Sequence, residues 1–303
     1  MRNRSRRGLT ATLALVLTFG GAACASEIAF VGSYTWRMDD ARFGGLSGIE
    51  LSQDGTTFTA ISDRAGILTG RILRDGGRIT GVDAGPVAEL MDLNGRPMPR
   101  EIADSEGLAI GDDGRIYISF EGRNRVWAYT TPETPVALPR AVAFAGLQNN
   151  AGLEALAIDA QGRLYTLPER SGDLTRPFPV WRFDGTSWSE VFSIPRRGTY
   201  LPVGADFGPD GKLYILERLF NGFSFRSRVR RFTVDDSGAR DEETLLETYP
   251  FRHDNLEGLS VWQDDSGAIR LTMVSDDNFN PLQRTELVEY VVPESLASAP
   301  RSP

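Results

Sequence analysis

Residues 103–123 read ADSEGLAIGDDGRIYISFEGR, and this stretch carries the pattern that predicts the fold. An apolar run leads into an Asp-Gly pair at Gly114, and a second apolar run, IYISF, follows it. Two short strand-like segments joined by Asp-Gly are typical of a β-hairpin. Glu106 stands at the start of the first segment, and Glu121 directly follows the second.

This hairpin phrase recurs along the chain. Its turn glycines are Gly55, Gly114, Gly162, Gly211 and Gly267, separated by 59, 48, 49 and 56 residues. Further strand-like segments follow in several units, at 126–129 and 141–144, at 180–183 and 190–194, and at 229–234 and 244–249. Units of about four short strands without intervening helices predict an all-β protein, a β-propeller. We count five blades, and a sixth within residues 75–104 is the alternative.

The last unit supplies only three strand-like segments, of which 287–292 is the third. Residues 28–32 can supply the fourth strand, which would join both ends of the chain in one blade and remove an open sheet edge. We therefore expect one propeller domain over residues 26–295, preceded by a signal peptide at 1–25 and followed by a disordered tail at 296–303.

The first 26 residues, MRNRSRRGLTATLALVLTFGGAACAS, have a basic start, an apolar run and small residues before Ser26. This order predicts a secretory signal and a periplasmic or secreted protein. The SRRGL motif and Cys24 leave two alternatives open, namely Sec or twin-arginine export, and lipidation or loss of the cysteine. Without Cys24 the mature chain has no thiol, which excludes disulfides and cysteine–metal sites.

The chain is acidic, with a net charge of −8 from 33 basic and 41 acidic residues. Loss of residues 1–25 removes four arginines and no acid, so the net charge becomes −12. This charge argues against nucleic acid or an anionic membrane surface as a partner. Beyond the signal no segment is long and apolar enough to span a membrane. We expect a monomer.

The repeated acids have a predictable position in a propeller. The innermost strand of each blade lines the channel and the second strand runs back beside it, so first-strand starts and second-strand ends share one face. The acids at first-strand starts are Glu106, Glu154 and Glu257. Those at second-strand ends are Asp63, Glu121, Glu169, Glu217 and Asp276. The architecture therefore predicts that these eight carboxylates converge on one mouth of the channel.

Crowded carboxylates are unfavourable unless positive charge compensates them. Arginines follow four of the second-strand acids, at Arg64, Arg123, Arg170 and Arg218, and can pair with them or bind an anionic substrate. The last unit instead has Asp276-Asp277-Asn278, and oxygen ligands of this kind suit calcium. The hypothesis is a metal site formed by Glu106, Glu154, Glu257, Asp276 and Asp277. A purely structural acid–arginine network is the alternative.

The catalytic candidates are Glu154, Glu106 and His253. His253 is the only histidine and lies four residues before Glu257, so it is either a general acid or base or an incidental packing residue. The sequence has no G-x-S-x-G nucleophile motif, and a Ser-His-Asp triad would have to use this histidine.

The repeated phrases also carry a resemblance to a known family. They are GGLSGIELSQDG (44–55), AISDR (60–64), DSEGLAIGDDGRIYISFEGR (104–123), GLEALAIDAQGRLYTLPER (152–170), GADFGPDGKLYILER (204–218), NLEGLSV (255–261) and SDDN (275–278). In these the chain resembles the phytase-like domain family of exported bacterial proteins, described as having esterase-like activity. The resemblance implies a β-propeller that hydrolyses a small-molecule ester or phosphate, that is, a phosphoric or carboxylic ester, with calcium as cofactor. A non-catalytic propeller that binds a ligand or protein on its channel face is the alternative.

Overall fold

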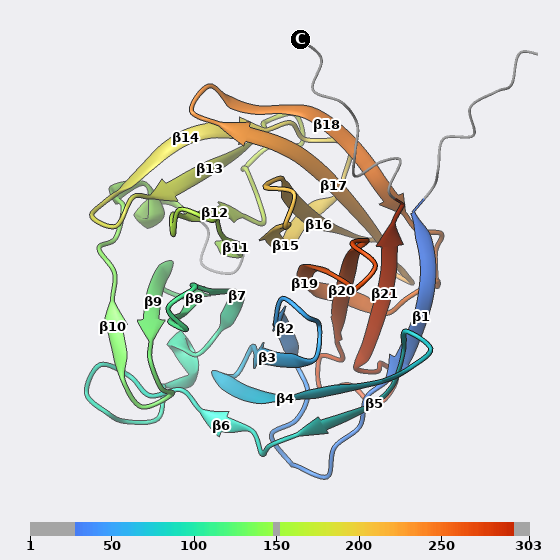
Figure 1. The fold of residues 1–303 in the computed structure, drawn as a ribbon. Coiled ribbons are helices and arrows are strands. Elements are labelled where there is room, and N and C mark those ends of the chain that lie inside the picture. Colours follow the sequence, from blue (N-terminus) through green and yellow to red (C-terminus); the bar gives the residue numbers. More distant parts are fainter. Residues whose placement is uncertain (1–27, 148–151, 294–303) are drawn as a thin grey trace, which may run out of the picture.

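The computed structural model describes residues 28–147 and 152–293. Five antiparallel sheets are arranged as blades around a central channel (Figure 1), so the prediction of a five-bladed propeller is confirmed. The predicted signal peptide and C-terminal tail lie outside the described residues.

Each blade has four main strands, and the first in each of the following lists lines the channel. The first blade contains β2 (Leu46–Leu51), β3 (Thr57–Ser62), β4 (Gly66–Asp75) and β5 (Arg78–Ala84), with the short β6 (Ala88–Glu89) paired to β4. The second contains β7 (Ser105–Ile110), β8 (Ile116–Phe120), β9 (Arg125–Tyr129) and β10 (Pro135–Ala137). The third contains β11 (Leu153–Ile158), β12 (Leu164–Pro168), β13 (Phe178–Phe183) and β14 (Trp188–Ile194). The fourth contains β15 (Leu201–Phe207), β16 (Leu213–Phe220), β17 (Phe225–Asp235) and β18 (Gly238–Glu247). The fifth contains β19 (Asn255–Gln263), β20 (Ile269–Asp276), β21 (Glu286–Val292) and β1 (Ala29–Thr35).

The N-terminal strand closes the ring. β1 pairs antiparallel with β21, from Ala29 opposite Val291 to Thr35 opposite Glu286. The expected closing strand at 28–32 is therefore present, although it begins at Ala29 and continues to Thr35. Closure places the two ends of the described chain in one blade (Figure 1).

Two groups of glycines make this architecture possible. At the hairpin turns, Gly114 and Gly211 have φ of 78° and 71°, a conformation that side chains disfavour, although a Cβ there would meet nothing within 4 Å. In the inner strands the constraint is space. A Cβ on Gly107 would lie 2.6 Å from the backbone nitrogen of Leu156, and one on Gly204 would lie 2.5 Å from the carbonyl oxygen of Glu257. These inner-strand glycines let neighbouring blades approach closely around the channel.

The core lies between the blades. The described buried apolar residues form clusters that each combine side chains from two adjacent blades. One such cluster joins Leu216 and Val229 of the fourth blade to Leu271 and Met273 of the fifth. Stacking of blades therefore buries the faces that a single four-stranded sheet would leave exposed.

One sequence expectation about strands was wrong, and the alternative of a sixth blade is excluded for the described residues. Residues 141–144 do not form a strand, because Val142–Gly146 is a 3-10 helix (η2) and β10 completes the second blade. Phe144 of this helix packs edge-on against Trp181, so its apolar residues fill the space between blades rather than pair in a sheet. The stretch 75–104 holds no sixth blade. It contains β5, β6 and a second 3-10 helix, η1 (Arg100–Ile102).

Candidate functional site

Acidic side chains gather where the inner strands begin. We call this end of the channel the acidic mouth and define it by Asp63, Asp104, Glu106, Glu121, Glu154, Glu169, Glu257, Asp276 and Asp277. The structure brings these side chains together from the first, second, third and fifth blades, and their charges act on one another across the channel. Seven of the eight acids that the sequence placed at one mouth belong to this set.

The second blade supplies the tightest cluster. One carboxylate oxygen from each of Asp104, Glu106 and Glu121 lies within 4.8 Å of the others. Glu121 is only 4% exposed, and its Oε1 accepts the backbone N–H of Gly152 at 2.5 Å. Burial, together with the charges of Glu154 and Asp104, raises the pKa of Glu106 well above its ordinary value. Burial also raises the pKa of Glu121, to about 7.

The same effect extends around the mouth. Burial, followed by the charges of Glu121 and Glu169, raises the pKa of Glu154 well above its ordinary value. Burial raises the pKa of Asp63 to about 7 and that of Asp276 to about 8, and in both cases the charge of Glu257 adds to the effect. The mouth therefore holds protons near neutral pH that isolated carboxylates would have lost, and a cation bound there would displace them.

One partly buried guanidinium, that of Arg218, compensates part of this charge. Arg218 of β16 donates through Nη1 to Oε1 of Glu257 and, at 2.9 Å, to Oδ1 of Asn255, and through Nη2 to Oε1 of Glu169 at 3.1 Å. Burial opposes its charge, but Glu257, Glu154 and Glu169 outweigh that effect and raise the pKa of Arg218 above its ordinary value. Arg218 thus ties the third, fourth and fifth blades together at the mouth.

The other predicted arginines are exposed. The guanidinium of Arg64 lies 3.4 Å from the centre of the Phe279 ring. Arg170 pairs with Glu169 at 3.3 Å while remaining 55% exposed, and Arg123 is also exposed. Because their guanidinium groups reach solvent, these three can contact a ligand at the mouth, whereas Arg218 is already committed to its carboxylate partners.

Glu217 departs from the expected pattern. β16 continues to Phe220, so Glu217 lies inside the strand rather than at its end. Its fully buried carboxylate accepts Nε of Arg228 at 2.6 Å and Nη2 of Arg230 at 2.5 Å. The prediction that it joins the convergent acids was wrong, because arginines on the neighbouring strand β17 bind it inside the blade.

The structure does not bring His253 to the acidic mouth. The side chain is buried, and its Nε2 lies 2.8 Å from the hydroxyl of Tyr290 on β21. Its ring also lies beside Phe30 of β1. Burial lowers the pKa of His253 to about 4, helped by Arg252 and Arg284, so the ring is neutral at physiological pH. These contacts with the outer strands match the packing alternative.

A side cavity opens beside the acidic mouth, between the first and second blades. Its volume is about 590 Å³, and its lining combines the acids Asp63, Glu89 and Asp104 with Arg42, Arg64 and Arg100. Oδ1 of Asp63 is buried without a hydrogen-bond partner among the described residues. The cavity therefore places oxygen ligands for a cation next to side chains that can bind an anion.

Sequence reasoning missed several residues of this site. Asp104 and Asn255 each stand two residues before a strand-start glutamate, so the repeat contained a signal for both. Arg42 and Arg100 come from segments outside the repeated phrases, so no pattern in the sequence indicated that they line the same cavity as Asp63.

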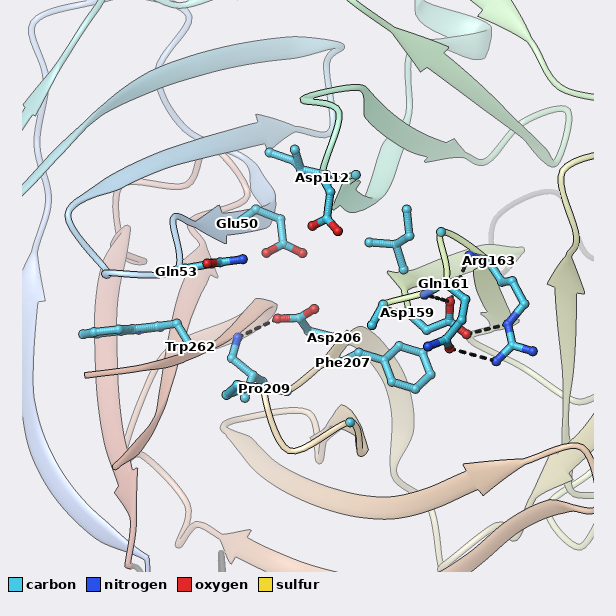
Figure 2. Close-up of a pocket in the computed structure, with 18 of the residues that line it drawn as sticks. Glu50, Gln53, Asp112, Asp159, Gln161, Arg163, Asp206, Phe207, Pro209 and Trp262 are labelled. Atoms are coloured by element: carbon cyan, nitrogen blue, oxygen red, sulfur yellow. Dashed lines mark hydrogen bonds and ion pairs between the residues drawn. The ribbon is translucent and has the colours of Figure 1, made fainter. Parts of the chain in front are cut away.

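The opposite end of the channel, where the hairpin turns lie, is the turn mouth. It holds a larger cavity of about 1060 Å³, shown in Figure 2. Glu50 of β2 and Asp206 of β15 project into it from the inner strands. The sequence did not identify these two acids, because each stands a few residues before a turn glycine, where acidic residues are common for turn reasons alone.

Comparisons with known proteins follow from this geometry. Among the residues that the structure describes, no helix has the length and apolarity to cross a membrane. A search of the curated proteins finds no matching sequence.

Solved structures of similar arrangement include a virginiamycin B lyase from Staphylococcus aureus, a gluconolactonase from Xanthomonas campestris and AofleA from Arthrobotrys oligospora. The lyase is 16% identical, with 88% of this chain and 75% of that chain covered and a TM-score of 0.41. The gluconolactonase is 12% identical, with 77% of this chain and 68% of that chain covered and a TM-score of 0.42. AofleA is 10% identical, with 84% of this chain and 70% of that chain covered and a TM-score of 0.48. Likenesses at this level carry no information about substrate or mechanism.

Sequence comparison with protein families is more informative. Residues 41–279, which include the inner strands of all five blades and every residue of the acidic mouth, match the family described as "Phytase-like: Esterase-like activity of phytase". The chain therefore belongs to the phytase-like family.

Proposed function

We propose that this protein is an exported ester hydrolase that acts at the acidic mouth on a phosphoric or carboxylic ester with the help of calcium. The observation that carries the proposal is the cluster of Asp104, Glu106 and Glu121 next to a cavity lined by arginines. Membership of the phytase-like family supports the same reaction class.

The residues at the mouth fit a calcium ion. The described donors are carboxylate oxygens and the amide of Asn255, which are the hard ligands that calcium prefers. The unpartnered Oδ1 of Asp63 also suits a cation. Asp104, Glu106 and Glu121 would hold the ion, with Glu154 beside them and Glu257, Asp276 and Asp277 on the fifth blade as further candidates. When bound there, calcium supplies positive charge that polarises the ester oxygen.

The chain's own residues would then perform the remaining steps. Arg42, Arg64 and Arg100 hold the anionic part of the substrate in the side cavity. Glu154, relieved of its neighbours' negative charge, accepts a proton from the attacking water. Water adds to the phosphorus or carbonyl carbon, the ester bond to the alcohol breaks, and the alcohol leaves with the proton that Glu154 returns. Arg218 keeps Glu169 and Glu257 in position throughout.

Activity of the purified protein tests this proposal. We expect hydrolysis of p-nitrophenyl phosphate or p-nitrophenyl acetate in calcium and its loss in chelator. Glu154→Gln keeps the shape of the side chain but removes the base, so turnover should fall by about a hundredfold. Glu190→Gln, on the exposed face of outer strand β14, is the matched control and should retain full activity.

A non-catalytic propeller is the second candidate, favoured by the Arg218 bridge, which resembles a structural tie between blades. If the wild-type protein hydrolyses neither ester in calcium, this candidate replaces the first. Export is tested separately, since periplasmic protein should begin at Ser26.

A further inference from the structure

The cavity at the turn mouth is a second candidate site, remote from the proposed ester chemistry. Its volume of about 1060 Å³ is sufficient for a small organic ligand. The lining comes from inner strands and hairpin turns of several blades. In Figure 2, Glu50, Gln53, Asp112 and Asp206 face a common space.

The described lining of this cavity carries five acids and one base, but most of the acids are either paired or exposed to solvent. Arg163 is the only basic residue among the described lining residues, and its Nε donates to Oδ2 of Asp159 at 2.7 Å. Asp112 and Asp113 lie at the exposed rim, where solvent screens them. No unpaired guanidinium is therefore available there for an anionic ligand, and the deep part of the cavity offers a cation only the pair formed by Glu50 and Asp206.

That pair has the properties of a hydrogen-bonding centre rather than of two free charges. Ser260 donates its hydroxyl to Oε2 of Glu50 at 3.2 Å, and the backbone N–H of Val261 donates to Oδ2 of Asp206 at 2.6 Å. Burial, with the charge of Asp206, raises the pKa of Glu50 well above its ordinary value, and burial raises that of Asp206 to about 7. A pair that retains a proton at neutral pH can both donate and accept hydrogen bonds.

The remaining lining adds amides and aromatic rings. Gln53 and Gln161 each carry a carbonyl and an NH₂ group, so they also donate and accept. Phe207 packs on Tyr165 with ring centres 5.0 Å apart, and Trp262 lies on the opposite side of the cavity in Figure 2. Hydroxyl groups of a ligand complement these amides, and its apolar C–H groups complement the part-exposed ring of Phe207.

We propose that the turn mouth binds a neutral, polyhydroxylated ligand such as a mono- or disaccharide. Such a molecule combines hydroxyl groups that donate and accept with apolar ring faces, and it carries no charge that the cavity would have to neutralise. The site is independent of ester hydrolysis at the acidic mouth.

Ligand-observed saturation-transfer NMR and calorimetry with glucose, galactose, maltose and sucrose test this assignment without any ester present. At least one sugar should bind to the wild-type protein at concentrations up to about 50 mM, which detects even millimolar affinity. Gln53→Ala, in an exposed turn where folding is not at risk, should weaken binding about tenfold or more. Glu50→Leu should abolish it, whereas Glu50→Gln, which keeps a neutral donor and acceptor, should retain most of it. Gln283→Ala, outside the cavity, is the matched control.

Three results would overturn the proposal. The first is the absence of binding by all four sugars. The second is binding of putrescine or inorganic phosphate in their place, because either would show that the cavity selects charge. The third is sugar binding that Gln53→Ala and Glu50→Leu leave unchanged, which would place the sugar elsewhere on the protein.

Discussion

The two mouths of the channel use the same residue types in opposite ways. At the turn mouth, the acids of the hairpin turns, such as Asp159, close the turns that carry them. Oδ1 of Asp159 accepts the N–H groups of Gln161 and Arg163, and its Oδ2 accepts Nε of Arg163. At the acidic mouth, Glu121, Glu169 and Glu257 instead receive hydrogen bonds from residues distant in the sequence. Asp159 is thus satisfied by its own turn and is part of the fold, whereas Glu121, Glu169 and Glu257 are held by residues of other blades or of the next loop at a place where a ligand can enter.

The largest expected effect comes from removing the compensating charge at the acidic mouth. Arg218→Gln leaves Glu169 and Glu257 close together without their shared guanidinium, so the free energy of unfolding without calcium should fall by about 3–5 kcal/mol. Urea denaturation measures this loss. Arg240→Gln, which breaks an exposed and solvent-screened ion pair with Asp235, should lower the free energy of unfolding far less. Equal losses in the two variants would mean that the mouth does not depend on Arg218.

Calcium provides the next effect and distinguishes the mouths directly. A cation that binds only the folded protein stabilises it by RT ln(1 + [L]/Kd), or about 2.7 kcal/mol at a hundredfold excess over Kd. The melting temperature should therefore rise by several degrees in millimolar calcium and fall with chelator. Glu106→Gln should reduce the shift, and Glu50→Gln should leave it intact. If Glu50→Gln instead abolishes the calcium-induced rise in melting temperature, the cation binds at the turn mouth. If the wild-type protein shows no such rise, the acid–arginine network is purely structural.

A smaller effect of opposite sign is expected at the turn mouth. The pKa of Asp206 is about 7 in the folded protein and near 4 in the unfolded chain. The unfolded state therefore releases this proton first, and the wild-type protein loses stability as pH rises from about 4 to about 7. Asp206→Asn removes this loss, so it should be more stable than wild type at pH 8 by roughly 1–3 kcal/mol and similar to it at pH 4.

Thermal unfolding across this pH range measures the difference. Asp159→Asn supplies the contrast at the same mouth, because it breaks the ion pair with Arg163 and should lower stability at pH 8. A variant Asp206→Asn that is less stable than wild type at every pH would contradict this prediction. It would mean that the hydrogen bonds to the ionised carboxyl of Asp206 stabilise it more than burial destabilises it.

Much of the fold could be predicted because the repeat constrains it locally. Turn glycines mark each hairpin, and the number of blades and the closing strand follow from counting strands. The error at 141–144 has a physical cause. A short apolar run such as AVAF can pair in a sheet or fill a gap between blades, and periodicity does not separate these outcomes.

The acidic mouth could be predicted from strand starts such as Glu106 and Glu154, since the geometry of a blade fixes where these residues point. Glu217 could not, because its partners Arg228 and Arg230 depend on the length and register of the hairpin between β16 and β17. Glu50 was missed for a related reason. A polar residue near a turn looks solvent-exposed in the sequence, and only ring closure places it in the channel.

The pairing of β1 with β21 also fixes how the molecule is oriented when it is held by its ends. The strands alternate in direction across the fifth blade, so β21 ends and β1 begins on the side of the turn mouth. Ile28 and Pro293 thus leave the same outer edge, close to one another. A label or tether joined directly at Ile28 or Pro293 would therefore start on the side of the turn mouth, with the acidic mouth facing away from it.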